Sequence, residues 1–338
     1  MTTPEVRLPT LQLRGLYRLQ VRRHGKLIAE RAWWDNLITD AGLEGLGEAK
    51  ALFRYCMVGT GNTAPAVGNT TLQAQVASVD YQTSTGTSSG GVATTSPRFG
   101  WERRTYPFAQ GAAVGNIAEV GVGWTTTNVF SRSLVSPAIT LLSIDQLTVT
   151  YEIRVYIPIE GTADVTGSVV IDGVTHNYTI RPLYAATTAR MQTNFGWQPN
   201  LLGLQATTRS WCGPMVGLAA GSNAGAQVYG SPAVLGPITD TFLRQSTGGA
   251  ASPQTGGGSG FAYFSDTISN SAYVTNSKEC KFTTSWGINN GNEASGIQGF
   301  SFTGLFGTYQ CVFSGTTITK NNTKKLDMVW KQSWARRP

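Results

Sequence analysis

The stretch "LTVTYEIRVYIP", residues 147–158, decides the fold class of this chain of 338 residues. Every second residue from 147 to 157 is apolar: Leu147, Val149, Tyr151, Ile153, Val155 and Ile157. The first four positions between them are polar, namely Thr148, Thr150, Glu152 and Arg154. This period of two is the pattern of a β-strand that buries one face. We therefore expect a long strand here, within a mostly β protein.

The composition favours the same fold class. The chain holds 40 glycines, while charged residues make up only 13% of it, against about a quarter in an average globular protein. Thr, Ser and Asn fill many polar positions, as in strands that are joined by many turns. Aromatic residues make up 10% and include 9 Trp, enough for a sizeable core. Large aromatic side chains also suit protein interfaces.

Local signals mark two hairpins and one helix. A turn at His24 and Gly25 joins alternating segments within residues 16–34, and Asp172-Gly173 suits a type I′ turn within residues 168–180. In "DNLITDAGLEGL", residues 35–46, Thr39 or Asp40 can cap the N-terminus of a helix. We expect this helix to be short and to lie near residues 39–48.

A glycine-rich stretch, "YCMVGTGNTAPAVGN" at residues 55–69, raises the possibility of a phosphate loop. Such a loop needs a Gly-Lys-Ser/Thr sequence and a helix that begins directly after it. Here no lysine follows, and Pro65 stands where the helix should begin. We therefore predict that the stretch binds no nucleotide, and that Gly59 and Gly61 let the backbone turn with positive φ. Gly115-Asn116 is a further expected turn.

The two halves of the chain share landmarks in the same order. "NFGWQPNLLGL" at 194–204 echoes "AWWDNLITDAGL" at 32–43, and "RSWCGPMVGLAAGSN" at 209–223 echoes "FRYCMVGTGN" at 53–62. The apolar residues of the segment from Leu326 to Trp330 correspond to those from Leu147 to Tyr151. We expect two related β-sandwich-like domains, 1–182 and 183–338, the second a possible diverged duplicate of the first. The alternative is two unrelated β-domains that share turn chemistry.

The charge and the cysteines narrow the classes of partner and cofactor. The net charge is +7, with basic residues gathered near both ends of the chain. This pattern favours a solvated strand face and a polar tail over nucleic-acid binding, and attraction to an acidic surface is an intermediate possibility. The four cysteines form no Cys-x-x-Cys pair, so a zinc site has no support. Pairing of Cys280 with Cys311 stays open.

Neither a secretion signal nor a membrane span is visible in the sequence. The first residues, "MTTPEVRLPTLQLRG", lack an apolar core after a basic start. No apolar run approaches the roughly 18 residues of a spanning helix. We expect a protein that is made in the cytoplasm with reduced thiols.

An ordered set of segments resembles a family of tailed-bacteriophage virion proteins, the tail-fibre or tail structural proteins. The set is "NLITDAGL", "YCMVGTGNTAP", "YPFAQGAAVGNIAEVGVGW", "VFSRSLV", "LTVTYEIRVYIP" and "VVIDGVTHNYTIRP", within about residues 14–182. The resemblance implies a β-rich, often oligomeric virion component at the end of the tail, without a cofactor. It carries over no catalytic residue. The second half departs from the pattern, because Glu119 has no acidic counterpart near Gly296.

Catalysis has little support in the sequence. Nucleophilic catalysis needs a base beside the nucleophile, and the only histidines, His24 and His176, lie beside expected hairpin turns. We expect both to be exposed. Glycan cleavage needs a pair of carboxylates, for which the candidates are Glu102, Glu119, Asp145 and Glu152. A turn role for Asp145 and a cross-strand ion pair for Glu152 are the simpler interpretations.

Binding without chemistry fits the sequence better. Four tryptophans are candidates for an interface or for the core: Trp33, Trp34, Trp101 and Trp124. Two polar segments, 80–97 and 246–260, are expected to be loops that contact a receptor glycan or a neighbouring subunit. We expect a non-enzymatic tail-tip, baseplate or fibre component of a virion, a homo-oligomer with a trimer favoured. The alternatives are a head fibre or decoration protein and, in another class, a surface-glycan hydrolase.

Overall fold

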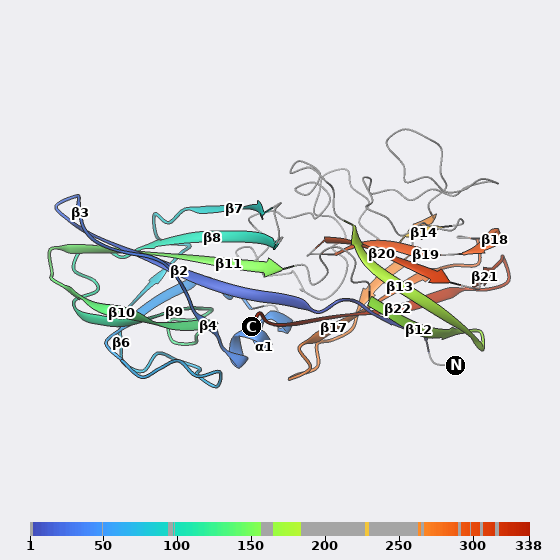
Figure 1. The fold of residues 1–338 in the computed structure, drawn as a ribbon, viewed down its shortest axis with the longest axis horizontal. Coiled ribbons are helices and arrows are strands. Elements are labelled where there is room, and N and C mark those ends of the chain that lie inside the picture. Colours follow the sequence, from blue (N-terminus) through green and yellow to red (C-terminus); the bar gives the residue numbers. More distant parts are fainter. Residues whose placement is uncertain are drawn as a thin grey trace.

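The protein is mostly β, as the sequence predicts. The computed structural model describes residues 3–48, 50–93, 97, 99–156, 165–183, 227–229, 263–264, 267–289, 292–297, 299–304, 307–314 and 318–338 (Figure 1). Most of the described residues lie in strands, and only a few lie in a helix. The single helix that is described lies near the N-terminus, where we expected it.

The largest sheet has nine strands in the order β16-β17-β22-β2-β11-β8-β7, with β1 beside β22 and β3 beside β2. An inner strand of this sheet, β11, contains most of the stretch that decided the fold class, and it pairs antiparallel with both β2 and β8. Ile157, the last residue of the predicted alternation, lies outside the described residues. The nine strands are β1 (Glu5–Arg7), β2 (Leu11–Arg23), β3 (Lys26–Asp35), β7 (Ser88–Ala93), β8 (Phe99–Pro107), β11 (Asp145–Tyr156), β16 (Thr267–Asn270), β17 (Glu279–Trp286) and β22 (Leu326–Arg336).

A second sheet of five strands packs against one end of the first and forms a sandwich with it. Its order is β4-β10-β9-β5-β6, and its strands are β4 (Leu37–Ile38), β5 (Tyr55–Gly59), β6 (Gln75–Asp80), β9 (Gly115–Gly123) and β10 (Ser131–Leu141). The apolar face of β11 enters the core between the two sheets, together with side chains of β2, β9 and β10. Tyr17 and Tyr151 are central to this core, with ring centroids 5.0 Å apart. We call it the first core.

Helix α1 (Asp40–Gly47) closes one edge of the first core. Thr39 is its N-cap, and the hydroxyl of Thr39 accepts a hydrogen bond from the backbone N–H of Gly42 at 2.9 Å. Leu43 and Leu46 are buried against the sheets. The cap that the sequence suggested therefore starts the helix at the expected place.

A third sheet of six strands forms a second sandwich with the other end of the nine-stranded sheet. Its order is β12-β13-β20-β19-β14-β15, and the small pair β18–β21 adjoins it. Asp172 and Gly173 lie at φ 52° and 80°, as the predicted turn between β12 and β13 requires. The strands are β12 (Val165–Ile171), β13 (Val174–Leu183), β14 (Gln227–Tyr229), β15 (Tyr263–Phe264), β18 (Glu293–Ile297), β19 (Gly299–Gly304), β20 (Gly307–Ser314) and β21 (Ile318–Lys320). The enclosed apolar cluster is the second core.

Strand β22 belongs to both sandwiches. Its first half pairs with β17 and, in parallel, with β1, which places Trp330 in the second core. Its last residues pair in parallel with the start of β2, and Trp334 enters the first core. The indole N–H of Trp334 donates to the carbonyl of Leu43 in α1 at 2.8 Å. Strands β2, near the start of the chain, and β22, near its end, therefore connect the two sandwiches (Figure 1).

The division into domains 1–182 and 183–338, and their duplication, stay predictions. Strand β12 and all but the last residue of β13 precede residue 183, and both strands contribute to the second core. Strands β11 and β22 flank β2 in one sheet, the first antiparallel and the second parallel to it. The echoing segments 194–204 and 209–223 lie outside the described residues. Cys280 and Cys311 do not form a disulfide with each other, because each is buried in a different core.

Trp330 offers a test of the second core. Its indole is fully buried, lies 6.4 Å from the ring of Phe282, and donates to the hydroxyl of Thr284 at 2.8 Å. Trp330→Ala should lower the free energy of unfolding by about 3–5 kcal/mol, because it removes apolar contacts and leaves a cavity.

Chemical denaturation followed by circular dichroism measures this difference. Val170→Ala on β12 is the control, because its side chain is 56% exposed, and it should change the stability by less than about 0.5 kcal/mol. Equal effects of the two substitutions would contradict the second core.

Candidate functional site

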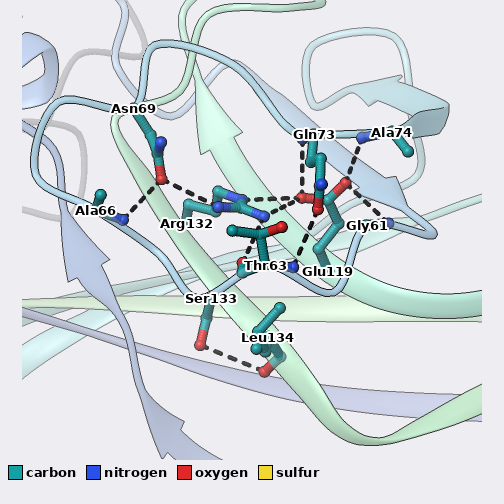
Figure 2. A network of polar contacts seen from close by, with 10 residues as sticks. All are labelled: Gly61, Thr63, Ala66, Asn69, Gln73, Ala74, Glu119, Arg132, Ser133 and Leu134. Atoms are coloured by element: carbon teal, nitrogen blue, oxygen red, sulfur yellow. Dashed lines mark hydrogen bonds and ion pairs between the residues drawn. The ribbon is translucent and has the colours of Figure 1, made fainter.

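The glycine-rich stretch forms strand β5 and the first part of a surface loop, residues 60–74, that joins β5 to β6. Three backbone N–H groups of this loop point at one carboxylate, that of Glu119 in β9 (Figure 2). Gly61 and Ala74 donate to its Oε1 at 3.2 and 2.7 Å, and Gln73 donates to its Oε2 at 3.0 Å. The Glu119 side chain is fully buried. Both ends of the loop are therefore fixed to the same acidic group.

Arg132 in β10 completes the network. Its Nε donates to Glu119 Oε2 at 2.8 Å, and one terminal nitrogen donates to the carbonyl of Thr63 at 2.9 Å. The other terminal nitrogen donates to Oδ1 of Asn69 at 3.0 Å. The same oxygen also accepts a hydrogen bond from the backbone N–H of Ala66 at 2.8 Å. The guanidinium is only 2% exposed. The ion pair thus also holds the middle of the loop (Figure 2).

The surroundings of Glu119 keep it ionised. Burial on its own raises the pKa of this carboxyl. The backbone N–H groups of Ala74 and Gln73 and the guanidinium of Arg132 outweigh burial, and they hold the pKa of Glu119 below its usual value of 4.5. The site is therefore an internal ion pair at neutral pH.

This geometry answers the question that the glycines raise. The N–H groups that a phosphate would need are hydrogen-bonded to a carboxylate of the protein itself. Our expectation of positive φ at Gly59 and Gly61 is wrong, because neither is among the described glycines with positive φ. A Cβ at Gly61 would lie 2.5 Å from Glu119 Oε1, and a Cβ at Gly59 would lie 2.4 Å from the carbonyl of Ala74. Both positions require glycine because neighbouring atoms lie too close for a side chain. Gly115 does lie at positive φ, 117°, but Gly115 and Asn116 are the first residues of β9 and pair with Leu141 and Thr140, so the turn expected there is wrong.

The outer side of the loop faces solvent. Residues 62–64, 66–68, 70–71 and 73–74 are exposed, and most of them are small or polar. Inside, Leu72 packs with Met57 and Val129 in a small apolar cluster. Buried hydrogen bonds to Glu119 and Arg132 therefore hold the backbone of the loop, while its outer side chains are exposed to solvent.

The four candidate carboxylates are each bound to arginine. Residues that are opposite each other on paired strands point to the same face of the sheet. Glu102 is opposite Ile153, which belongs to the first core. Glu152 is opposite Arg103, which lies on the outer face. Glu102 and Glu152 thus point to opposite sides and form no catalytic pair. The expected ion pair at Glu152 is present, and Asp145, expected in a turn, begins β11. The ion pairs are Glu102–Arg104, Glu119–Arg132, Asp145–Arg23, Glu152–Arg103 and Glu152–Arg154.

The four candidate tryptophans separate into two kinds. Trp34 and Trp124 pack against the first core, and the Trp34 indole donates to the hydroxyl of Ser133 at 2.9 Å. Trp33 and Trp101 lie half-buried on either side of Arg103, whose guanidinium carbon is 4.7 and 4.9 Å from their ring centroids. Trp33 and Trp101 therefore belong to the outer face of the nine-stranded sheet.

Two further expectations need correction. His24 is an exposed turn residue, but His176 is only 3% exposed and packs edge-on to Phe313, because it lies on the inward face of β13. Residues 88–93 of the expected loop 80–97 form β7, which pairs with β8. The other expected loop, 246–260, lies outside the described residues.

Sequence reasoning missed Arg132. It stands in "VFSRSLV", one of the segments that carry the family resemblance, and no motif links it to Glu119. An available signal was an isolated acid, Glu119, within an otherwise uncharged strand, "GNIAEVGVG". A charge at such a place requires a buried partner.

The comparisons with known proteins find no relative. No family model, no curated protein and no solved structure matches the chain. Among the described residues, no cluster of three or more His, Cys, Asp and Glu side chains is placed to hold a metal ion. In the same part of the chain, no helix has both the length and the apolar character that crossing a membrane requires.

The substitution Gly61→Ala tests whether the backbone at Gly61 lies too close to Glu119 and Gln73 to allow a side chain. The added methyl group would collide with Glu119 Oε1 and with Cβ of Gln73 at 2.6 Å, so we expect a loss of about 1–3 kcal/mol of stability. Gly68→Ala is the matched control in the same loop, because a Cβ there has no atom within 4 Å. Thermal unfolding measures both, and equal stabilities would contradict the packing. Calorimetry with ATP and GTP should show no binding to the wild type.

Glu119→Gln tests the ion pair and its pH dependence. At pH 7 the substitution leaves Arg132 buried without its counter-charge, so the free energy of unfolding should fall by about 3–5 kcal/mol. The pKa of Glu119 is lowered in the folded state, so its contribution is complete above 4.5 and is lost as the pH falls below that value. The difference between wild type and variant should therefore shrink in acid.

Denaturation curves between neutral pH and pH about 3 measure this difference. Glu48→Gln is the control, because Glu48 makes an exposed ion pair with Lys50, and it should cost less than about 1 kcal/mol. A Glu119→Gln deficit that is small, or that is the same at every pH, would contradict the role of the ion pair.

Proposed function

We propose that the chain is a non-enzymatic structural component of a tailed-phage virion, at the tail tip, baseplate or tail fibre. Its role is to join other virion proteins and to contribute to host attachment. The proposal rests on the resemblance of residues 14–182 to tail structural proteins, together with the character of the loop at residues 60–74.

The fixed loop is the observation that carries the proposal. Irregular segments of this length are uncommon in compact domains, and many of them bind a partner. Glu119 and Arg132 hold this one at residues 61, 63, 69, 73 and 74, while its outer side is exposed. A loop that is ordered before binding loses little conformational entropy on contact, which favours stable attachment to a neighbouring protein.

The state of the acidic groups supports a structural role over glycan hydrolysis. A hydrolase needs one carboxylic acid and one carboxylate facing a common cleft. Here, Glu102 and Glu152 point to opposite sides of a sheet, and Glu119 and Asp145 are each hydrogen-bonded to an arginine and to backbone N–H groups. Such groups hold strands and loops in place.

We further propose that the protein works as a homo-oligomer, with a trimer as the favoured state. The low charge and the high aromatic content resemble the composition of stable subunit interfaces. The half-buried pair Trp33 and Trp101 on the outer face of the large sheet is a candidate contact.

Electron cryo-microscopy of phage particles whose genome encodes this chain tests the proposal. We expect density for the two joined sandwiches at the end of the tail, in a threefold arrangement, with the loop at residues 60–74 against a neighbouring protein. Particles assembled with a tagged chain and labelled with an antibody provide an independent location.

Three other results would each favour a different conclusion about the function. Label on the head would favour the alternative of a head fibre or decoration protein. Absence of the chain from purified particles would contradict a virion role altogether. Release of sugars from host envelope material by the purified protein would instead favour the hydrolase.

A further inference from the structure

Three turns meet at the end of the first sandwich that lies away from the six-stranded sheet (Figure 1). They are the β2–β3 turn, the segment 109–114 between β8 and β9, and the β10–β11 turn. Asp145 joins all three. Its carboxylate accepts from Arg23 Nε at 2.7 Å and from the N–H of Leu142 at 2.9 Å, and its carbonyl accepts from the N–H of Gly111 at 3.0 Å. We call residues 22–28, 109–114 and 142–145 the tip.

The tip exposes large aliphatic side chains. Leu27, Ile28, Leu142 and Ile144 are 46, 48, 46 and 38% exposed. In the part of the chain whose side chains are described, only one other Leu or Ile, Ile288, is exposed. Concentration of such residues at one end of a molecule indicates a contact surface, because single exposed aliphatic residues are normally scattered.

The charges around these side chains are of one sign. Arg22 and Lys26 are exposed, as is His24 at the apex of the first turn. The one acidic residue of the tip, Asp145, is inaccessible to solvent and ion-paired with Arg23. The tip therefore presents aliphatic side chains beside uncompensated positive charge.

We propose that the tip binds the surface of an anionic lipid bilayer. Leu and Ile side chains enter the region between headgroups and acyl chains, while Arg22 and Lys26 contact lipid phosphates. The hydrogen bonds of Asp145 hold in place the turns that carry these side chains.

Two other occupants fit the tip less well. A second copy of the tip would bring Arg22 and Lys26 toward the same charges of its neighbour, and like charges across an interface are unfavourable. A protein partner is favoured by aromatic side chains at the centre of an interface, and the tip contains none. An anionic bilayer matches both the charge and the aliphatic character.

Vesicle co-sedimentation with the purified full-length chain tests this proposal. We expect binding to vesicles of phosphatidylcholine mixed with phosphatidylglycerol, weak binding to phosphatidylcholine alone, and a loss of binding at high salt. The double variant Leu142→Ser, Ile144→Ser should reduce the partition coefficient at least about tenfold. The double variant Arg22→Gln, Lys26→Gln should remove the preference for phosphatidylglycerol.

Val170→Ser is the matched control, because Val170 is 56% exposed but lies on β12, in the second sandwich. It should bind vesicles like the wild type, and circular dichroism should show all variants folded. Three outcomes would overturn the proposal: no binding to anionic vesicles, equal binding by the tip variants and the wild type, or tip variants that change only the oligomeric state. The assay uses isolated protein, so its result is independent of the proposed place in a virion.

Discussion

The buried ion pair between Glu119 and Arg132 is the interaction on which the first sandwich depends. The two residues stand on neighbouring strands, β9 and β10, so their contact also fixes how these strands pair. Removal of either partner would leave a buried charge without compensation, which is among the most costly changes a protein can undergo. From this pair follow the conformation of the loop at residues 60–74 and the need for glycine at positions 59 and 61.

A second constraint comes from the long sheet that the two sandwiches share. Strand β22 begins in the second core and ends in the first, where Arg336 donates to the carbonyl of Ile38 and to the carboxylate of Asp40. Because β1 and β2 pair with this strand in parallel, a break near either end of the chain would weaken both cores. The first sandwich, which includes one end of the shared sheet, carries both the candidate loop and the tip.

The parts that the sequence predicted are those decided by local chemistry. The alternation from Leu147 to Val155, the cap at Thr39 and the turn at Asp172-Gly173 depend on residues within a few positions of each other. Contacts between distant segments were not predictable in this way. Arg132 is far in sequence from Thr63, and His176 lies on the buried face of β13 beside Phe313, which is also distant in sequence. The glycines at 59 and 61 were identified correctly as special, but for the wrong physical reason.

Amide hydrogen exchange of the native protein tests the central claim most directly. If the buried ion pair holds the loop, the N–H groups of Gly61, Gln73 and Ala74 should be protected nearly as strongly as those in the middle of β9, although they lie in a surface loop. The amides of Asn62 and Val67, which make no contact with Glu119, should exchange much faster. Equally fast exchange at all five positions would contradict the account, because the loop would then be open in solution and Glu119 would not fix it.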